Sequence, residues 1–68
     1  MITVVANGRP VDLPDGATLV ALLDALGVSA KAVAALEHNG EAVARADHAA
    51  CSLSDGDRVE LVRAVAGG

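Results

Sequence analysis

The chain contains no Phe, Tyr or Trp among its 68 residues. Its core must therefore be built from Val, Leu, Ile and Ala, and it offers no aromatic ring on which a nucleobase or a sugar could stack. A domain of this size also buries only about 60% of the surface that its unfolded chain exposes, which leaves little room for a deep substrate cavity. Both points disfavour a self-contained enzyme.

Basic residues are scarce. Five Lys and Arg stand against nine Asp and Glu, which gives a formal net charge of −4. The chain has no run of basic residues that would bind nucleic acid or an anionic membrane, so we expect neither as a partner. The negative charge would suit a partner with a basic docking surface, although it also serves to keep a small domain soluble.

The chain has a single cysteine, Cys51, which cannot form an internal disulfide, so the fold needs no oxidising compartment. Residues 1–5 include no basic leader, and no apolar run approaches the length of a membrane span. These features predict a cytoplasmic protein.

The hydrophobic pattern predicts strands at 2–6 and 9–13, joined by the tight turn Asn7-Gly8. A helix follows, with Thr18 as its N-cap and Gly27 after its last turn. Its apolar stripe has the spacing i, i+3, i+4, i+7 and consists of Leu19, Leu22, Leu23 and Leu26.

The second half of the chain predicts three more strands, at 33–38, 41–43 and 58–65, of which the last is the longest. Asn39-Gly40 joins the first two, a helical turn is expected at 45–50, and Asp55-Gly56 forms a turn before the last strand.

The predicted order β-β-α-β-β-β places two hairpins around one principal helix. We expect a single α+β domain over residues 1–68, with the helix packed on one face of a mixed sheet of four to five strands. The first and last strands are the most apolar, so they should lie centrally and pair in parallel. This arrangement is the β-grasp, or ubiquitin-like, architecture.

The sequence ends in Gly67-Gly68, directly after the predicted last strand. A diglycine has no side chains and can enter a channel that is too narrow for other residues. We therefore expect a flexible tail over residues 64–68, with the α-carboxylate of Gly68 as the most reachable functional group in the chain.

These features together resemble the ThiS family, the ubiquitin-like sulfur carriers of thiamine biosynthesis. The likeness covers essentially the whole chain, and its segments are Asn7-Gly8, residues 18–27, residues 36–40 and, most specifically, residues 55–68. The family implies that a ThiF-like enzyme adenylates Gly68 and that a cysteine desulfurase relay supplies sulfur to form a thiocarboxylate. A ThiG-like thiazole synthase then takes the sulfur. The resemblance implies no cofactor, and the partner enzymes recognise Gly67, Ala66 and Val65.

Alternation along the strands puts Val5, Ala35, Glu60 and Val62 on the face away from the helix. Val5 and Val62 are not needed on a solvent face, so we expect them to dock the adenylating enzyme and the thiazole synthase, with ordinary apolar exposure as the alternative. Arg63 should contribute because it lies near the functional end.

Cys51 could accept sulfur, with His48 as the nearest activating group in sequence, but a structural cysteine is the better interpretation. The spacing of His38, His48 and Cys51 matches no zinc pattern, so we expect surface or turn histidines and no metal. Asp55 and Asp57 are interpreted as turn formers. No set of nucleophile, base and orienting residue is apparent, which disfavours a hydrolase.

Other functions stay open at this point. The small subunit of molybdopterin synthase shares the diglycine, but it is usually a longer chain, with an aromatic residue and prolines before the glycines. Residues 63–66, Arg-Ala-Val-Ala, favour the thiamine branch. Carriers for tRNA thiolation or cysteine synthesis, and a plain interaction module with an inert tail, are the remaining alternatives.

Overall fold

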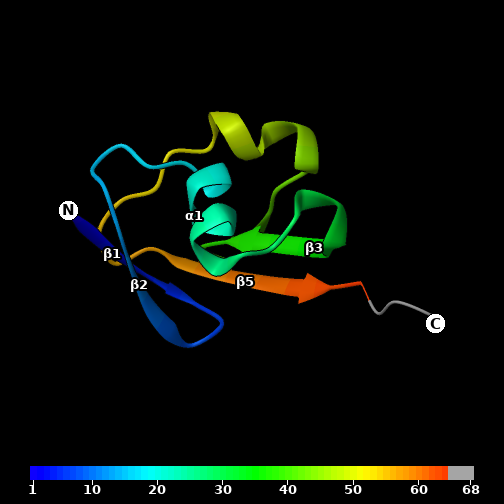
Figure 1. Cartoon of the computed structure of the whole chain (residues 1–68), viewed down its shortest axis with the longest axis horizontal. Helices are drawn as coiled ribbons and strands as arrows, with labels where there is room; N and C mark the ends of the chain where they lie inside the picture. Colours follow the sequence, from blue (N-terminus) through cyan, green and yellow to red (C-terminus); the bar gives the residue numbers. More distant parts are fainter. Residues whose placement is uncertain (65–68) are drawn as a thin grey trace.

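The computed structural model describes residues 1–64 and confirms the predicted order of strands and helix. A short 3-10 turn, η1, precedes the third strand, and a second one, η2, occupies the predicted helical turn. Figure 1 shows α1 lying across one face of the sheet. The elements are β1 (Ile2–Ala6), β2 (Arg9–Leu13), α1 (Leu19–Leu26), η1 (Ala30–Ala32), β3 (Val33–His38), β4 (Glu41–Ala42), η2 (Arg45–Ala50) and β5 (Arg58–Arg63).

The five strands form one mixed sheet in the order β2-β1-β5-β3-β4. β1 and β5 pair in parallel, with Val5 beside Arg58, while every other neighbouring pair is antiparallel. The predicted central, parallel pairing of the first and last strands is therefore confirmed. A helix-covered sheet of this topology is a β-grasp.

Both hairpins turn where the sequence predicts. Asn7 and Gly8 have φ values of 49° and 81°, and Asn39 and Gly40 have values of 52° and 86°. Two successive positive φ angles define the turn type that matches the twist of a two-residue hairpin. The turns thus fix the registers of β1 with β2 and of β3 with β4.

The helix buries its leucine stripe against the sheet and ends at Gly27, whose φ is 69°. Thr18 occupies the predicted N-cap position, but its side chain makes no capping hydrogen bond. Instead, the N–H of Leu19 donates to the carbonyl of Cys51 at 3.1 Å. The inward-facing strand residues are buried as expected, and the largest fully buried side chains of the core are Leu19, Leu22, Val4 and Val59.

The last strand is shorter than predicted. β5 ends at Arg63 and has the same length as β3, because Val33 at the start of β3 is the last residue that can pair with it. β4 likewise ends at Ala42 rather than at residue 43. Val65 lies outside the described residues, as does all of the predicted tail after Ala64. Within residues 1–64, no helix is long and apolar enough to cross a membrane.

Candidate functional site at the end of β5

The chain leaves the sheet at the end of β5, where β3 is the strand that still pairs with it. Arg63 forms the last pair with Val33, and the N–H of Ala64 donates to the carbonyl of Ala32 at 2.7 Å. Figure 1 shows this exit at the opposite end of the molecule from the N-terminus. The predicted tail residues Val65, Ala66, Gly67 and Gly68 lie beyond it, outside the described part of the chain, and their roles stay predictions.

Asn7 fastens the first hairpin to the second half of β5. Its Oδ1 accepts from the N–H of Leu61 at 2.8 Å, and its Nδ2 donates to the carbonyl of Leu61 at 3.0 Å. The side chain therefore continues the contact of β1 with β5 after the regular ladder has ended at Ala6 and Val59. The sequence showed Asn7 only as a turn former, because no local pattern reports a partner so distant in the chain.

The predicted docking residues do not lie together. Val62 is 60% exposed on the outer face of the sheet, opposite Ala35. Val5 pairs with Arg58, four residues before Val62, which is about 13 Å along the strand at 3.3 Å per residue. The exposed Glu60 lies between them on the same face. Of the two valines, only Val62 borders the exit of the chain.

Arg63 lies on the other side of the strand, toward the helix. There it lines a cavity of about 330 Å³ together with Arg9 from the first hairpin. Leu26, Val28 and Leu61 contribute apolar surface to this cavity. The structure therefore brings Arg63 together with Arg9 rather than with Val62, and the sequence did not single out Arg9.

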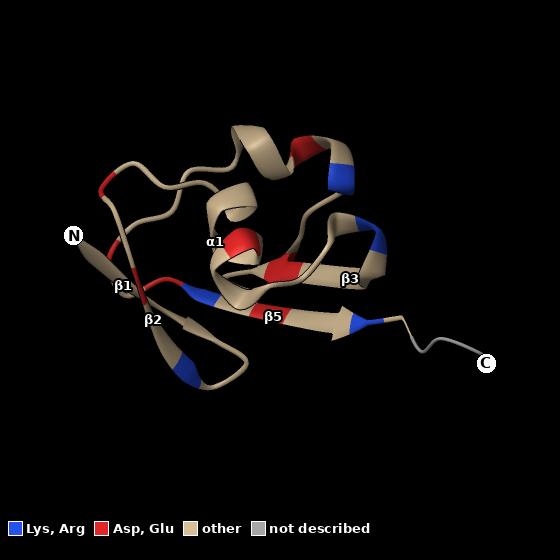
Figure 2. Cartoon of the chain, viewed as in Figure 1, with Lys and Arg blue, Asp and Glu red and all other residues tan. Residues whose placement is uncertain are grey.

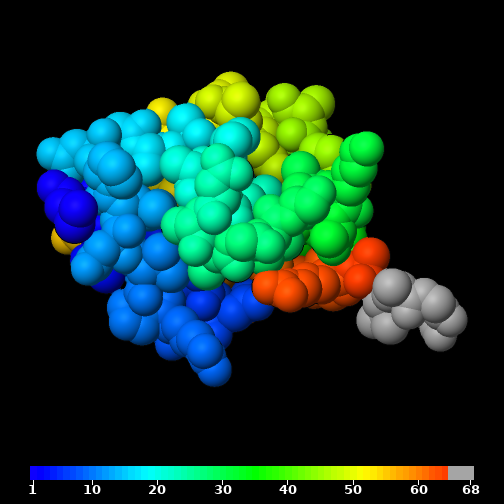
Figure 3. All heavy atoms as spheres, in the orientation of Figure 1, coloured from blue at the N-terminus to red at the C-terminus, as the bar shows by residue number. Residues whose placement is uncertain are grey.

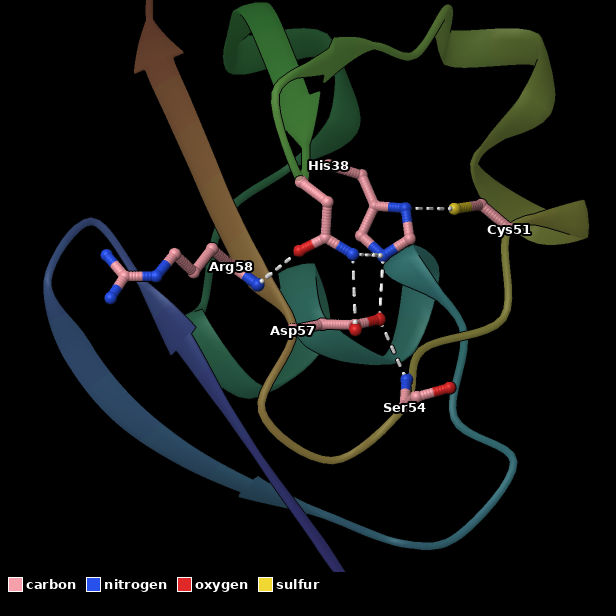
Figure 4. A network of polar contacts seen from close by, with 6 residues as sticks. His38, Cys51, Ser54, Asp57 and Arg58 are labelled. Carbon is pink, nitrogen blue, oxygen red and sulfur yellow. Dashed lines mark hydrogen bonds and ion pairs between the residues drawn. The ribbon is translucent and has the colours of Figure 1, made fainter.

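The start of β5 carries a network of polar contacts, shown in Figure 4. The Asp57 carboxylate contacts His38 Nε2 at 2.7 Å and accepts from the N–H of Ser54 at 2.9 Å and from Asn39 Nδ2 at 3.2 Å. The N–H of Arg58 donates to Asn39 Oδ1 at 2.8 Å. Partial burial alone would raise the pKa of Asp57, but these donors outweigh it and lower the pKa below its ordinary value.

The sequence showed no set of nucleophile, base and orienting residue, but the structure brings a thiol, an imidazole and a carboxylate together. They belong to Cys51, His38 and Asp57. Cys51 Sγ lies 3.5 Å from His38 Nδ1, and the residue that faces the thiol is thus His38 and not His48. Burial, and then the charge of Asp57, raise the pKa of Cys51, so the group is a protonated thiol at neutral pH. Because the thiolate is the nucleophile, this arrangement favours a structural role.

Of the two expected positions, surface or turn, His48 takes the turn, and its side chain is buried at 4% exposure. It lies in η2 and packs toward α1, lining a cavity of about 360 Å³ with Val20 and Leu23. Its Nδ1 has no hydrogen-bond partner within residues 1–64. No group of three or more potential metal ligands occurs in this part of the chain.

Comparisons with known proteins agree with the fold. A sequence profile of the ThiS family matches residues 2–68. The crystal structure of the thiamine biosynthesis protein ThiS from Geobacter metallireducens has 33% identity and a TM-score of 0.78, with 98% of this chain and 100% of that chain covered. The NMR structure of a thiamine biosynthesis protein from the same organism gives 36% identity and a TM-score of 0.78, covering 98% and 88%.

A longer relative is also similar. A thiazole synthase from Paramagnetospirillum magneticum (strain ATCC 700264 / AMB-1) is 38% identical over 64 residues, which is 94% of this chain and 19% of that protein. The chain thus spans about a fifth of the length of this relative.

The topology and the structural matches define a ubiquitin-like β-grasp domain. The chain belongs to the ThiS family.

Proposed function

We propose that this chain carries sulfur for the formation of the thiamine thiazole ring, as a thiocarboxylate on Gly68. The observation that carries the proposal is the match to the ThiS family over residues 2–68, which includes the diglycine. The fold supports it, because β5 is a central strand that pairs with β3 as far as Arg63, five residues before Gly68.

The chemistry begins at a carboxylate, which is a poor electrophile. A carboxylate oxygen of Gly68 attacks the α-phosphorus of ATP on a ThiF-like partner, pyrophosphate leaves, and an acyl-adenylate forms. The terminal sulfur of a persulfide, supplied by a cysteine desulfurase relay, then displaces AMP from the carbonyl carbon. A thiol reductant cleaves the resulting S–S bond and leaves the thiocarboxylate. Glycine at this position presents no side chain that would hinder either attack.

In this scheme the chain is a substrate of its partners and has no catalytic machinery of its own. A ThiG-like thiazole synthase receives the sulfur. The relative from P. magneticum supports this pairing, since a segment similar to this chain occurs there within a protein that is itself a thiazole synthase.

Intact-mass spectrometry tests the proposal. The purified chain is incubated with a ThiF-like enzyme, ATP and a persulfide donor, and we expect a mass increase equal to the replacement of one oxygen by sulfur. Omission of the sulfur donor should instead accumulate the adenylate. Two matched variants, one lacking Gly68 and one with an alanine added after it, should remain unmodified. A folded chain that binds the enzyme but gains no mass would contradict the proposal and indicate an interaction module.

A further inference from the structure

The charges of this acidic protein are unevenly placed along β5. Near the end of the strand lie Arg63 itself, Arg9 in the shared cavity, and Lys31, two residues before the Val33 that pairs with Arg63. Four acidic residues lie at the other end, where β1 and β5 both begin. They contact residues 1, 3 and 54, and they are Asp12, Asp15, Asp55 and Asp57. Figure 2 shows a blue segment at the end of β5 and red segments near the N-terminus, with further red segments on α1 and along β5.

The cavity between Arg9 and Arg63 combines cationic walls with an apolar floor. Leu26, Val28 and Leu61 form the floor, and no Asp or Glu of residues 1–64 lines it. Asn7 also lines the cavity, but both ends of its amide are engaged by Leu61. Figure 3 shows the first hairpin, the end of α1 and β5 meeting on one face of the molecule.

Both arginines are exposed, and neither takes part in an ion pair within the described residues, whose two ion pairs are Met1–Asp15 and His38–Asp57. A guanidinium is a planar fork of donors that matches a carboxylate, and it is weakly hydrated enough to work at an interface. The apolar floor would accommodate the methylene groups that carry such a carboxylate. These features fit an Asp or Glu side chain better than an apolar anchor.

We propose that this cavity, between Arg9 and Arg63, docks an acidic side chain of the adenylating enzyme, and that Lys31 adds to the electrostatic attraction. The inference rests on the proposed function, which supplies that enzyme. The occupant is not the nucleotide, because Gly68 lies five positions beyond Arg63, a span of up to about 17 Å when extended. The net charge of −4 therefore conceals a basic end that faces the partner.

The test measures the KM for the carrier in pyrophosphate release by the adenylating enzyme. The double variant Arg9→Glu/Arg63→Glu should raise this KM about tenfold or more and leave kcat unchanged, because two exposed ion pairs become repulsive. Added salt should raise the KM of the unmodified carrier and so reduce the difference in KM between it and the double variant. Arg58→Glu is the control at the other end of β5: it makes the same change of charge as each single Arg→Glu substitution and should alter KM less than about twofold.

Thermal melts establish that each variant is folded. If the double variant and Arg58→Glu have equal KM values while the unmodified chain is adenylated normally, this inference is overturned and the proposed function survives. The inference would also be overturned if the carrier alone bound ATP and the double variant did not, because the cavity would then be a phosphate site. An unmodified chain that the enzyme never adenylates would remove both the proposed function and the inference.

Discussion

The two ends of β5 are built differently. At its start, the Asp57 carboxylate has three hydrogen-bonding neighbours, and the backbone of Arg58 is held by Asn39. At its end, Val62 and Arg63 have exposed side chains, and their backbone pairs with β3 alone. The Asp57 network thus lies away from the end of β5 that leads to the diglycine, and the side chains of Val62 and Arg63 at that end remain available to a partner.

This division has a physical reason. The antiparallel ladder with β3 covers most of β5, but the parallel ladder with β1 spans only two residue pairs, so side-chain contacts add to the hold on the β1 side. The Asp57 network fixes where the strand begins, and Asn7 fixes its second half. A partner can then contact the exposed end without disturbing the contacts that hold the fold. A substitution at one end of β5 should therefore leave the properties of the other end unchanged.

The largest effect is expected at the start of β5. Asp57→Ala leaves the N–H of Ser54 and the side chains of His38 and Asn39 without their acceptor, and should lower the free energy of unfolding by about 2–4 kcal/mol. Urea denaturation measures this loss. At a temperature where the variant is still folded, its KM with the adenylating enzyme should equal that of the unmodified chain. A raised KM would show that the two ends are coupled.

The same network has a defined pH dependence. The pKa of Asp57 in the folded protein lies below its ordinary value of 3.8, so the ionised carboxylate stabilises the fold above that pH, and this contribution is lost as the pH falls through the lowered pKa. The difference in unfolding free energy between the unmodified chain and Asp57→Asn should therefore shrink as the pH falls below 3.8. A difference that persists in strong acid would mean that the charge of Asp57 is not its source.

Asn7 is expected to have an intermediate effect. Asn7→Gly keeps a residue suited to the positive φ of 49° but removes both hydrogen bonds to Leu61. We expect a loss of about 1–2 kcal/mol in urea denaturation, since the amide groups of Leu61 lose their partner. Asn39→Gly at the equivalent turn provides a comparison, because it too keeps the turn but frees Asp57 and Arg58. An unaltered stability of Asn7→Gly would show that the side chain does not hold the hairpin to β5.

The sequence predicted the scaffold well because its signals are local. The Asn-Gly turns, the leucine stripe and the glycine after it specify the hairpins and the helix from neighbouring residues alone. The polar contacts around β5 were missed because they join residues far apart, as Asn7 does with Leu61 and Cys51 with His38. The outer-face register was missed for a related reason: alternation gives the face of Val5 and Val62 but not the offset between their strands.

A smaller effect is expected at the outer face beside the exit of the chain. Val62 is 60% exposed, so Val62→Asp should change the free energy of unfolding by no more than about 0.5 kcal/mol. If this residue docks the partner enzymes, the variant should bind the adenylating enzyme and the thiazole synthase several-fold more weakly by calorimetry. Val5→Asp is the matched comparison and should have less effect on binding, because the register places it near the start of β5. Equal affinities for Val62→Asp and the unmodified chain would remove the outer face from the docking site.

The smallest effect is expected for Cys51. This residue lies near the start of β5, away from the end that leads to the diglycine, and it should not contribute to sulfur transfer. Burial and the charge of Asp57 raise the pKa of this thiol, so little thiolate is present at neutral pH and its alkylation by iodoacetamide should be slower than that of a free cysteine. Alkylation should become faster on unfolding, as the thiol leaves His38. Cys51→Ser should still be converted to the thiocarboxylate at an unchanged rate. A folded Cys51→Ser chain that fails to gain sulfur would mean that the thiol takes part in the transfer, and that the functional residues extend to both ends of β5.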